Sequence, residues 1–295
     1  MKKATYYLLD VFAEDKYCGN QLAIFPEAAN ISEELLSKIA RELNLSETVF
    51  LYPKKNNRWP MRIFTPGGEL PTAGHPTIGT AFYMSRQTDH AIDAPLDILF
   101  EQKIGEIKAT VDFRNNLPIF SSMLQPLPEF MAEYEDRSSI ASLFNREESE
   151  LLDLPIEKVS CGLPYVIVPF RALESIKQIE FRLDRWNEIK AAFGNAFVYA
   201  FCPNGEDGGH VHGRMFAPDI GVLEDPATGS ANGPLGCYCV KHQLTDHSII
   251  SEQGYEIGRK SKIYIDIAES GNGEIRMVKV GGKSVFIGKG EIFLN

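Results

Sequence analysis

The sequence lacks the marks of membrane proteins and of disulfide-linked secreted proteins. No apolar run reaches the roughly 18 residues that a membrane-spanning helix needs. The start, Met1–Tyr6, leads directly into a strand-like segment that contains Asp10, without the uninterrupted apolar stretch of a signal peptide. We therefore expect a cytoplasmic protein that binds no membrane.

The sequence is also poor in cysteine and in clustered positive charge. Its five cysteines are an odd number and are spread along the chain, which argues against a disulfide framework. Lys and Arg total 30 against 40 Asp and Glu, a net charge of −10, and no basic cluster stands out. An acidic surface repels phosphate backbones, so we expect no nucleic-acid partner. The cysteines are Cys18, Cys161, Cys202, Cys237 and Cys239.

No metal site or nucleotide motif is evident. Cys237 and Cys239 form C-x-C without a second cysteine pair, so a zinc site is not indicated. His210 and His212 would point to one face of a strand, but without an evident third ligand a solvated pair is the favoured interpretation. The phosphate loop G-x-x-x-x-G-K and the dinucleotide motif G-x-G-x-x-G are both missing. The residues themselves therefore indicate neither a zinc site nor one of these nucleotide-binding motifs.

The chain contains an internal repeat at the scale of half its length, which suits two domains. Gly162–Pro169 repeats the pattern of Gly19–Pro26, a short apolar strand closed by proline, 143 residues later. Two further motifs return in the same order, at offsets of 152 and 155 residues: Arg-apolar-Phe-x-Pro at 62–66 and 214–218, and Glu-x-Pro-x-x-Gly at 69–74 and 224–229. Four matches in one order, counting the strands that follow the first helix of each half, indicate a duplication.

Strands and helices alternate in each half, which predicts an α+β fold with a mixed sheet. Apolar spacing predicts a helix over 31–43 capped by Ser32, and a second over 184–194 capped by Asp184. The stretches 76–84 and 231–240 are small and apolar nearly all round, so each should be a helix buried on all sides. Residues 205–209 read as a hairpin loop.

The repeat also predicts the domain boundaries. The first half should cover 1–118 and the second 119–282, with the active site in the cleft between them. The proline-containing region 117–154 is the candidate crossover, and the alternating tail 283–295 is expected to be a strand that pairs back onto the first half.

Two glycine turns open the two buried helices, and this arrangement suits an anion. The first N–H groups of a helix have no partner within it and carry the positive end of its dipole. Glycine lets a ligand approach closely, so a carboxylate or phosphate could bind at Gly74 and Gly229. If the halves face each other, His75 and Ser230 are equivalent side chains of one cleft. The alternative is that both glycines merely serve tight turns.

Two carboxylates are candidates for proton transfer. Asp225 stands in the second loop where the first loop has Leu70. Glu47 lies between a helix and an apolar strand, where partial burial would raise its pKa toward that of a useful proton carrier. The alternative for Glu47 is a surface acid or a helix cap. Glu69 and Glu224 are matched between the halves, which favours a shared structural role.

Several of these motifs resemble one known family, the PhzF-like proteins of phenazine biosynthesis, in order and over nearly the whole chain. The motifs are Asp10-Val11-Phe12 with Gly19-Asn20, the segment Glu42–Thr48, Gly74-His75-Pro76-Thr77 and the segment Glu224–Ala231. The resemblance implies the diaminopimelate epimerase fold, in which two pseudo-symmetric halves each wrap a curved mixed sheet around a central buried helix. It also implies a homodimer and an isomerisation without metal or cofactor.

The resemblance further assigns roles to individual residues. Glu47 would move a proton between carbons of a small carboxylate-bearing substrate, while His75, Asp225 and Ser230 hold the substrate and assist. Asn20, Gly74, Pro76, Thr228 and Gly229 would line the substrate site. True epimerases of this fold use two cysteines at the helix N-termini, where this chain has His75 and Ser230, so a single-acid proton shuttle is favoured.

Two rival hypotheses remain from the sequence. The first is a binding or regulatory protein that keeps the cleft without the chemistry. The second is a hydrolase that uses Ser230, His75 and Asp225, although the G-x-S-x-G elbow of such enzymes is missing. The sequence names neither the substrate nor the direction of the reaction.

Overall fold

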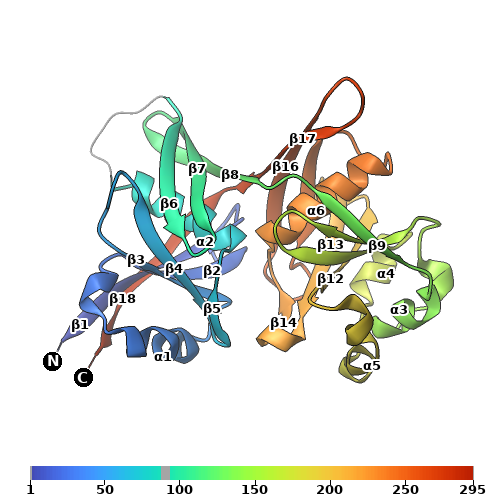
Figure 1. Ribbon diagram of the computed structural model, residues 1–295, viewed down its shortest axis with the longest axis horizontal. Helices are drawn as coiled ribbons and strands as arrows, with labels where there is room; N and C mark the ends of the chain where they lie inside the picture. The colour runs from blue at the N-terminus through green and yellow to red at the C-terminus, as the bar shows by residue number, and fades with distance from the viewer. Residues whose placement is uncertain (1, 88–93, 295) are drawn as a thin grey trace. The chain divides into compact units, whose positions relative to one another are not determined.

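The computed structural model describes residues 2–87 and 94–294 and divides into two compact units (Figure 1). Unit 1 comprises Met1–Leu124 and Gly281–Asn295, and unit 2 comprises Gln125–Val280. Parallel and antiparallel strand pairs both occur, which confirms the predicted mixed α/β architecture. Across the described ranges, no helix has the length and apolar character that crossing a membrane requires.

Unit 1 is a mixed sheet with one helix against each face. Strand β1 pairs antiparallel with both β18 and β2, β2 runs parallel to β3, and β4 joins the antiparallel β6–β7 hairpin through a short parallel pairing. Its elements are β1 (Lys3–Val11), β2 (Asn20–Phe25), η1 (Ala28–Asn30), α1 (Glu33–Leu43), β3 (Glu47–Leu51), β4 (Trp59–Thr65), β5 (Gly68–Leu70), α2 (Gly74–Ser85), β6 (Leu96–Gln102), β7 (Gly105–Arg114), β8 (Leu117–Gln125, whose last residue belongs to unit 2) and β18 (Ser284–Phe293).

Unit 2 has the same kind of sheet and more helices. Strand β10 pairs antiparallel with β9 and β11, β11 runs parallel to β12, and β13 joins the antiparallel β15–β16 pair through a parallel pairing. Its elements are β9 (Glu129–Tyr134), α3 (Arg137–Leu143), η2 (Glu148–Glu150), β10 (Ile156–Ser160), β11 (Pro164–Pro169), α4 (Leu173–Lys177), α5 (Leu183–Phe193), β12 (Phe197–Pro203), β13 (Val211–Ala217), η3 (Pro218–Ile220), β14 (Val222–Asp225), α6 (Gly229–Lys241), β15 (Ser248–Gln253), β16 (Ser261–Glu269) and β17 (Ile275–Gly282, whose last two residues belong to unit 1).

The strand registers of the two units match residue by residue at the offsets of the sequence repeat. Each unit contains a ladder across three strands whose members lie at the same positions of the repeated motifs. The ladders are Ala23–Thr48–Phe64 in unit 1 and Val166–Val198–Phe216 in unit 2. A one-residue slip would turn every side chain to the other face of the sheet. Residues that the motifs match therefore occupy equivalent places in the two units.

The helices α2 and α6 are buried along nearly their whole length, as their apolar composition predicts. Helix α2 packs against β1, β2, β3, β6, β7 and β18, and α6 packs against β10, β11 and β16. Glycine permits this close packing. A Cβ atom on Gly79 would lie 2.6 Å from the side chains of Leu22 and Val11, and one on Gly236 would lie 2.6 Å from Ile265.

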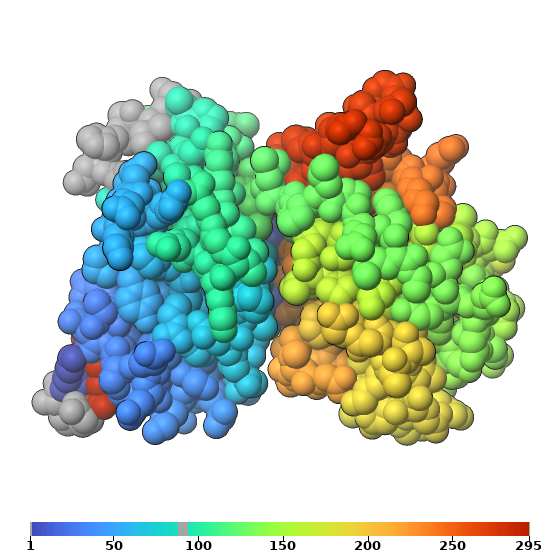
Figure 2. Space-filling model, viewed as in Figure 1, coloured from blue at the N-terminus to red at the C-terminus, as the bar shows by residue number. Residues whose placement is uncertain are grey.

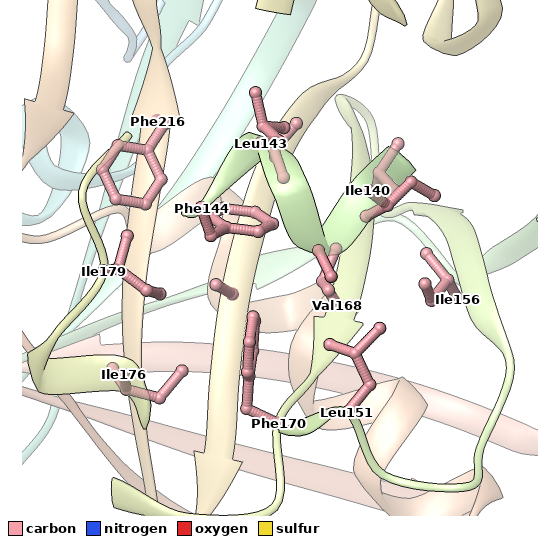
Figure 3. Close-up of a cluster of buried hydrophobic side chains, with 14 of the residues drawn as sticks. Ile140, Leu143, Phe144, Leu151, Ile156, Val168, Phe170, Ile176, Ile179 and Phe216 are labelled. Atoms are coloured by element: carbon pink, nitrogen blue, oxygen red, sulfur yellow. The ribbon is translucent and has the colours of Figure 1, made fainter. Parts of the chain in front are cut away.

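A second helical layer covers the opposite face of each sheet. In unit 1, α1 places Leu36, Ile39 and Ala40 against Phe25 and Phe50. In unit 2, α3, α4 and α5 cover a larger apolar cluster, in which Phe144 packs edge-on against Phe170 at 5.6 Å between ring centroids (Figure 3). Each sheet therefore has apolar side chains on both faces.

One hairpin lies outside these cores. The tip of the β16–β17 hairpin stands out in red from the surface in Figure 2, and its residues 271–274 are exposed.

The predicted cap of the 184–194 helix is wrong. Helix α5 begins at Leu183 after Arg182, and Asp184 lies in its first turn, where both carboxylate oxygens accept hydrogen bonds from Arg182. Ser32 occupies the N-cap of α1 as predicted.

Candidate active site

Unit 1 brings Glu47 and His75 together. Glu47 is the first residue of β3 and His75 the second residue of α2, so the start of a strand meets the start of the buried helix. Glu47 Oε2 lies 3.3 Å from His75 Nε2, and the two side chains are 15% and 4% exposed. A carboxyl group beside an imidazole in a nearly dry setting is an arrangement that can hold and move a proton.

The imidazole of His75 is neutral at pH 7. Burial lowers the pKa of His75 to about 3, while a hydrogen bond with the backbone of Gln21 opposes the shift. Because His75 Nε2 makes no hydrogen bond of standard geometry, the bond to Gln21 uses Nδ1. A backbone group that favours the protonated ring is a carbonyl oxygen, so Nδ1 carries the proton and Nε2 presents a lone pair toward Glu47. The two side chains are therefore not an ion pair.

The remaining predicted residues of unit 1 surround the start of α2. Gly74 opens the helix and Pro76 follows His75, both buried. Asn20 opens β2 and is fully buried. The N-cap position holds Ala73, whose side chain caps nothing, so the first N–H groups of α2 have no side-chain cap from that residue.

Unit 2 brings Asp225 and Thr228 together in the second Glu-x-Pro-x-x-Gly loop. Asp225 ends β14, and its Oδ2 accepts a hydrogen bond of 2.5 Å from Thr228 Oγ1. Both side chains are nearly buried. Asn232, one turn into α6, donates from Nδ2 to the main-chain oxygen of Thr228 at 2.8 Å. These bonds hold the loop firmly at the start of α6.

Ser230 follows Gly229 at the start of α6 and has a partner that the sequence did not suggest. Its Oγ shares a hydrogen bond of 2.6 Å with the hydroxyl of Tyr165, a buried residue of β11. Gly229 accepts a hydrogen bond at its main-chain oxygen from Gln125 Nε2, at 2.9 Å. Ser230 is thus hydrogen-bonded to a tyrosine, and His75 is bonded to the backbone of Gln21 and contacts Glu47, whereas the hydrolase hypothesis needs a serine bonded to a histidine.

Two glutamines, also missed by the sequence reasoning, hold the two loops. Gln102 donates from Nε2 to Thr77 Oγ1 and accepts at Oε1 from Thr72 Oγ1, both at 2.7 Å. In unit 2, Gln253 accepts at Oε1 from the backbone N–H of Thr228 and donates from Nε2 to the main-chain oxygen of Asp225 and to Thr228 Oγ1. The dipeptide Glu-Gln occurs at 101–102 and again at 252–253. This fifth match of the repeat could have identified the two glutamines from the sequence.

The matched arginines and glutamates have the structural role that the repeat favoured. Arg62 donates two hydrogen bonds to Glu69, and Arg214 donates two to Glu224, all between 2.7 and 3.0 Å. The guanidinium of Arg62 lowers the pKa of Glu69. Each ion pair joins the strand before the turn to the strand after it, and so fixes the shape of the turn that leads to the buried helix.

The predicted solvated pair of His210 and His212 is wrong. Strand β13 begins at Val211, so His210 lies in the exposed loop, where its Nδ1 accepts a hydrogen bond from the backbone of Ile250. His212 is fully buried between Glu252 and Glu256, at 3.0 and 2.9 Å. The predicted hairpin loop at 205–209 is confirmed, and its N–H groups at Glu206, Asp207 and Gly209 also bind the Glu252 carboxylate.

The cysteines are free thiols, four of them buried. Burial raises the pKa of Cys202 to about 12 and also raises that of Cys239, so these thiols are poor nucleophiles. Within residues 2–87 and 94–294, no three His, Cys, Asp or Glu side chains are placed to hold a metal ion. The expectation of a reaction without metal or cofactor stays a prediction.

Comparison with solved structures first defines the class of fold. A hydroxyproline epimerase from Agrobacterium vitis has a TM-score of 0.65 at 11% identity, covering 99% of this chain and 91% of that one. A PhzF-family protein from Bacillus anthracis has a TM-score of 0.89 at 26% identity, covering 99% and 100%. The chain thus has the mixed α/β fold shared by PhzF proteins and amino-acid epimerases.

The sequence comparisons then define the family. The model of the phenazine biosynthesis-like proteins, PhzC-PhzF, matches residues 9–290, so the chain belongs to that family. A trans-2,3-dihydro-3-hydroxyanthranilate isomerase from Pseudomonas aeruginosa is 34% identical over 98% of this chain and 99% of its own length. An uncharacterized isomerase from Clostridium acetobutylicum is 32% identical over the full length of both chains. The protein is an enzyme of the isomerase class.

Proposed function

We propose that this isomerase moves a proton between carbon atoms of a small carboxylate-bearing substrate, without a cofactor, and that Glu47 is the acid and base. The observation that carries the proposal is the contact between Glu47 and the neutral, buried His75. The similarity to a dihydro-3-hydroxyanthranilate isomerase supports a cyclic acid as substrate.

The proposed chemistry follows from the protonation state of His75. The Glu47 carboxylate removes a proton from one carbon and becomes a carboxylic acid. That acid can donate a hydrogen bond to the lone pair of His75 Nε2, which stabilises the protonated form. The carboxyl group then returns the proton to another carbon of the same substrate. No net proton is gained or lost, so the step needs no co-reactant.

The proposal assigns substrate binding to the starts of the two buried helices. The N–H groups near Gly74 and Gly229 are suited to a carboxylate. Asn20 and Pro76 in unit 1, and Asp225, Thr228 and Ser230 in unit 2, would complete the site. We also propose that the units are pseudo-symmetric copies, since their registers match and both place a polar residue after the helix-opening glycine.

The test is deuterium uptake from D₂O into a panel of cyclic and amino-acid carboxylates that includes dihydro-3-hydroxyanthranilate. We expect uptake with wild type and a loss of about 10²–10⁴-fold in Glu47→Gln, because a positioned acid and base contributes that much. Glu42→Gln, an exposed acid of α1, is the matched control and should retain full activity. Uptake by Glu47→Gln within tenfold of wild type would falsify the role of Glu47.

Two further parts of the proposal concern the state of the protein in the cell. We propose that it acts as a homodimer in the cytoplasm. Sedimentation equilibrium of the purified protein checks the first part, because a chain of 33.0 kDa should then give twice that mass. Fractionation of the source cells checks the second.

A further inference from the structure

The residue after each helix-opening glycine is oriented from the neighbouring strand in both units. In unit 1, the backbone of Gln21, on β2, bonds Nδ1 of His75 and so leaves Nε2 toward Glu47. In unit 2, the hydroxyl of Tyr165, on β11, bonds Oγ of Ser230. The two strands are equivalent in register, and the position of Tyr165 is held in unit 1 by Leu22. The hydroxyl of Tyr165 thus orients Ser230 in unit 2, as the backbone of Gln21 orients His75 in unit 1.

We propose that Tyr165 is a positioning residue that makes Ser230 a hydrogen-bond donor to an oxygen of the substrate. A serine hydroxyl has one hydrogen and two lone pairs. A phenol is more acidic than an aliphatic alcohol and is the better donor, so Tyr165 donates to Ser230 Oγ. The hydrogen of Ser230 is then available to an acceptor such as a carboxylate or enolate oxygen.

Burial supports this division of roles. Tyr165 is 1% exposed, and its ring packs against Phe197 at 5.7 Å between centroids, so its hydroxyl is positioned within the protein. Ser230 is only partly buried and is open to a ligand. The hydroxyl hydrogen of Thr228 is already donated to Asp225, so Ser230 is the hydroxyl that can add a side-chain donor to the N–H groups near Gly229. The inference rests on the proposed substrate class. It adds that Tyr165 orients the hydroxyl of Ser230 that recognises the substrate.

The experiment compares Tyr165→Phe with Tyr238→Phe. Tyr238 is the matched control, because it is a fully buried tyrosine of α6 whose hydroxyl donates to the main-chain oxygen of Pro155 at 2.6 Å, a bond that does not involve Ser230. Binding of 3-hydroxyanthranilate, a stable aromatic carboxylate, is measured by calorimetry at pH 7. A neutral hydrogen bond is worth about 0.5–1.5 kcal/mol, so Kd should rise roughly 2–10-fold in Tyr165→Phe and stay at the wild-type value in Tyr238→Phe.

A double-mutant cycle with Ser230→Ala separates positioning from a structural role. If Tyr165 acts through Ser230, the double variant binds no more weakly than Ser230→Ala alone. With a substrate that shows deuterium uptake, the loss in Tyr165→Phe should lie mainly in KM. Equal Kd values for wild type and Tyr165→Phe, or effects that add in the double variant, overturn the inference. If wild type binds 3-hydroxyanthranilate but no carboxylate of the panel takes up deuterium, the proposed proton transfer is contradicted. The inference about Tyr165 is then tested by the Kd values alone.

Discussion

Gln253 Nε2 donates a hydrogen bond of 2.7 Å to the main-chain oxygen of Asp225. The same amide also donates to Thr228 Oγ1, and its Oε1 accepts from the backbone of Thr228 and the hydroxyl of Tyr199. Gln253 is fully buried, and it adds to the bonds that Thr228 Oγ1 makes with Asp225 and that the Tyr199 hydroxyl makes with Ser251. One side chain thereby fixes the loop that carries both Asp225 and the start of α6.

Replacing Gln253 by alanine should therefore destabilise the protein strongly. Buried donors and acceptors that lose their partner cost about 1–3 kcal/mol each, with partial relaxation, so we expect a loss of about 2–4 kcal/mol in the free energy of unfolding. Gln102→Ala is the matched comparison in unit 1, because the side chain of Gln102 bonds two hydroxyl groups, those of Thr72 and Thr77. Urea unfolding measures both. An equal or larger loss in Gln102→Ala would contradict the proposed importance of the Gln253 network.

Much of the fold could be predicted from the sequence because the internal repeat consists of turn and strand motifs that recur in the same order. The glycines before His75 and Ser230 mark helices that are buried on all sides, and both helices are present. The matched Arg and Glu pairs form matching ion pairs. These features depend on residues close in sequence, where composition and spacing decide the local structure.

The parts that could not be predicted depend on strand register or on where an element begins. Tyr165 meets Ser230 only because β11 places it beside the start of α6, and an isolated tyrosine in an apolar strand gives no sign of this. His210 and His212 were expected on one face, but the strand begins between them, so one is exposed and the other is buried with two glutamates.

The neutral state of His75 should make folding sensitive to acid. In the unfolded chain a histidine takes up a proton as the pH falls below about 6.5, whereas folded His75 stays neutral until about pH 3. Protons therefore favour the unfolded state within this window, and the free energy of unfolding falls as the pH falls. Between pH 7.5 and 5.0, wild type should lose about 2 kcal/mol more than His75→Asn.

Urea unfolding of both proteins at the two pH values measures this difference directly. All other titrating groups are common to the two proteins, so their contributions cancel to first order in the comparison. A parallel pH dependence of wild type and His75→Asn would show that folded His75 takes up its proton over the same pH range as the unfolded chain, and would contradict the lowered pKa on which the proposed hydrogen bond from protonated Glu47 depends.

His212 should have the opposite effect, at alkaline pH. Burial alone would lower its pKa, but the hydrogen bonds to Glu252 and Glu256 outweigh burial and raise the pKa of His212 to about 9. The folded protein therefore keeps a proton that the unfolded chain releases above about pH 6.5. The resulting stability is fully present below pH 6.5 and is lost as the pH rises through 9. Wild type should lose roughly 3 kcal/mol more than His212→Gln between pH 6 and pH 9.5.

His210→Gln is the matched control, because this neighbouring histidine is exposed and contacts the backbone of Ile250. This variant leaves His212 and its two glutamates in place, so the alkaline loss of stability should remain. If His212→Gln also follows wild type, folding does not raise the pKa of His212, and the two glutamates do not hold an extra proton on its ring. Because the Glu252 carboxylate also binds three N–H groups of the 205–209 loop, loss of the charged pair should appear as faster hydrogen exchange at Glu206, Asp207 and Gly209.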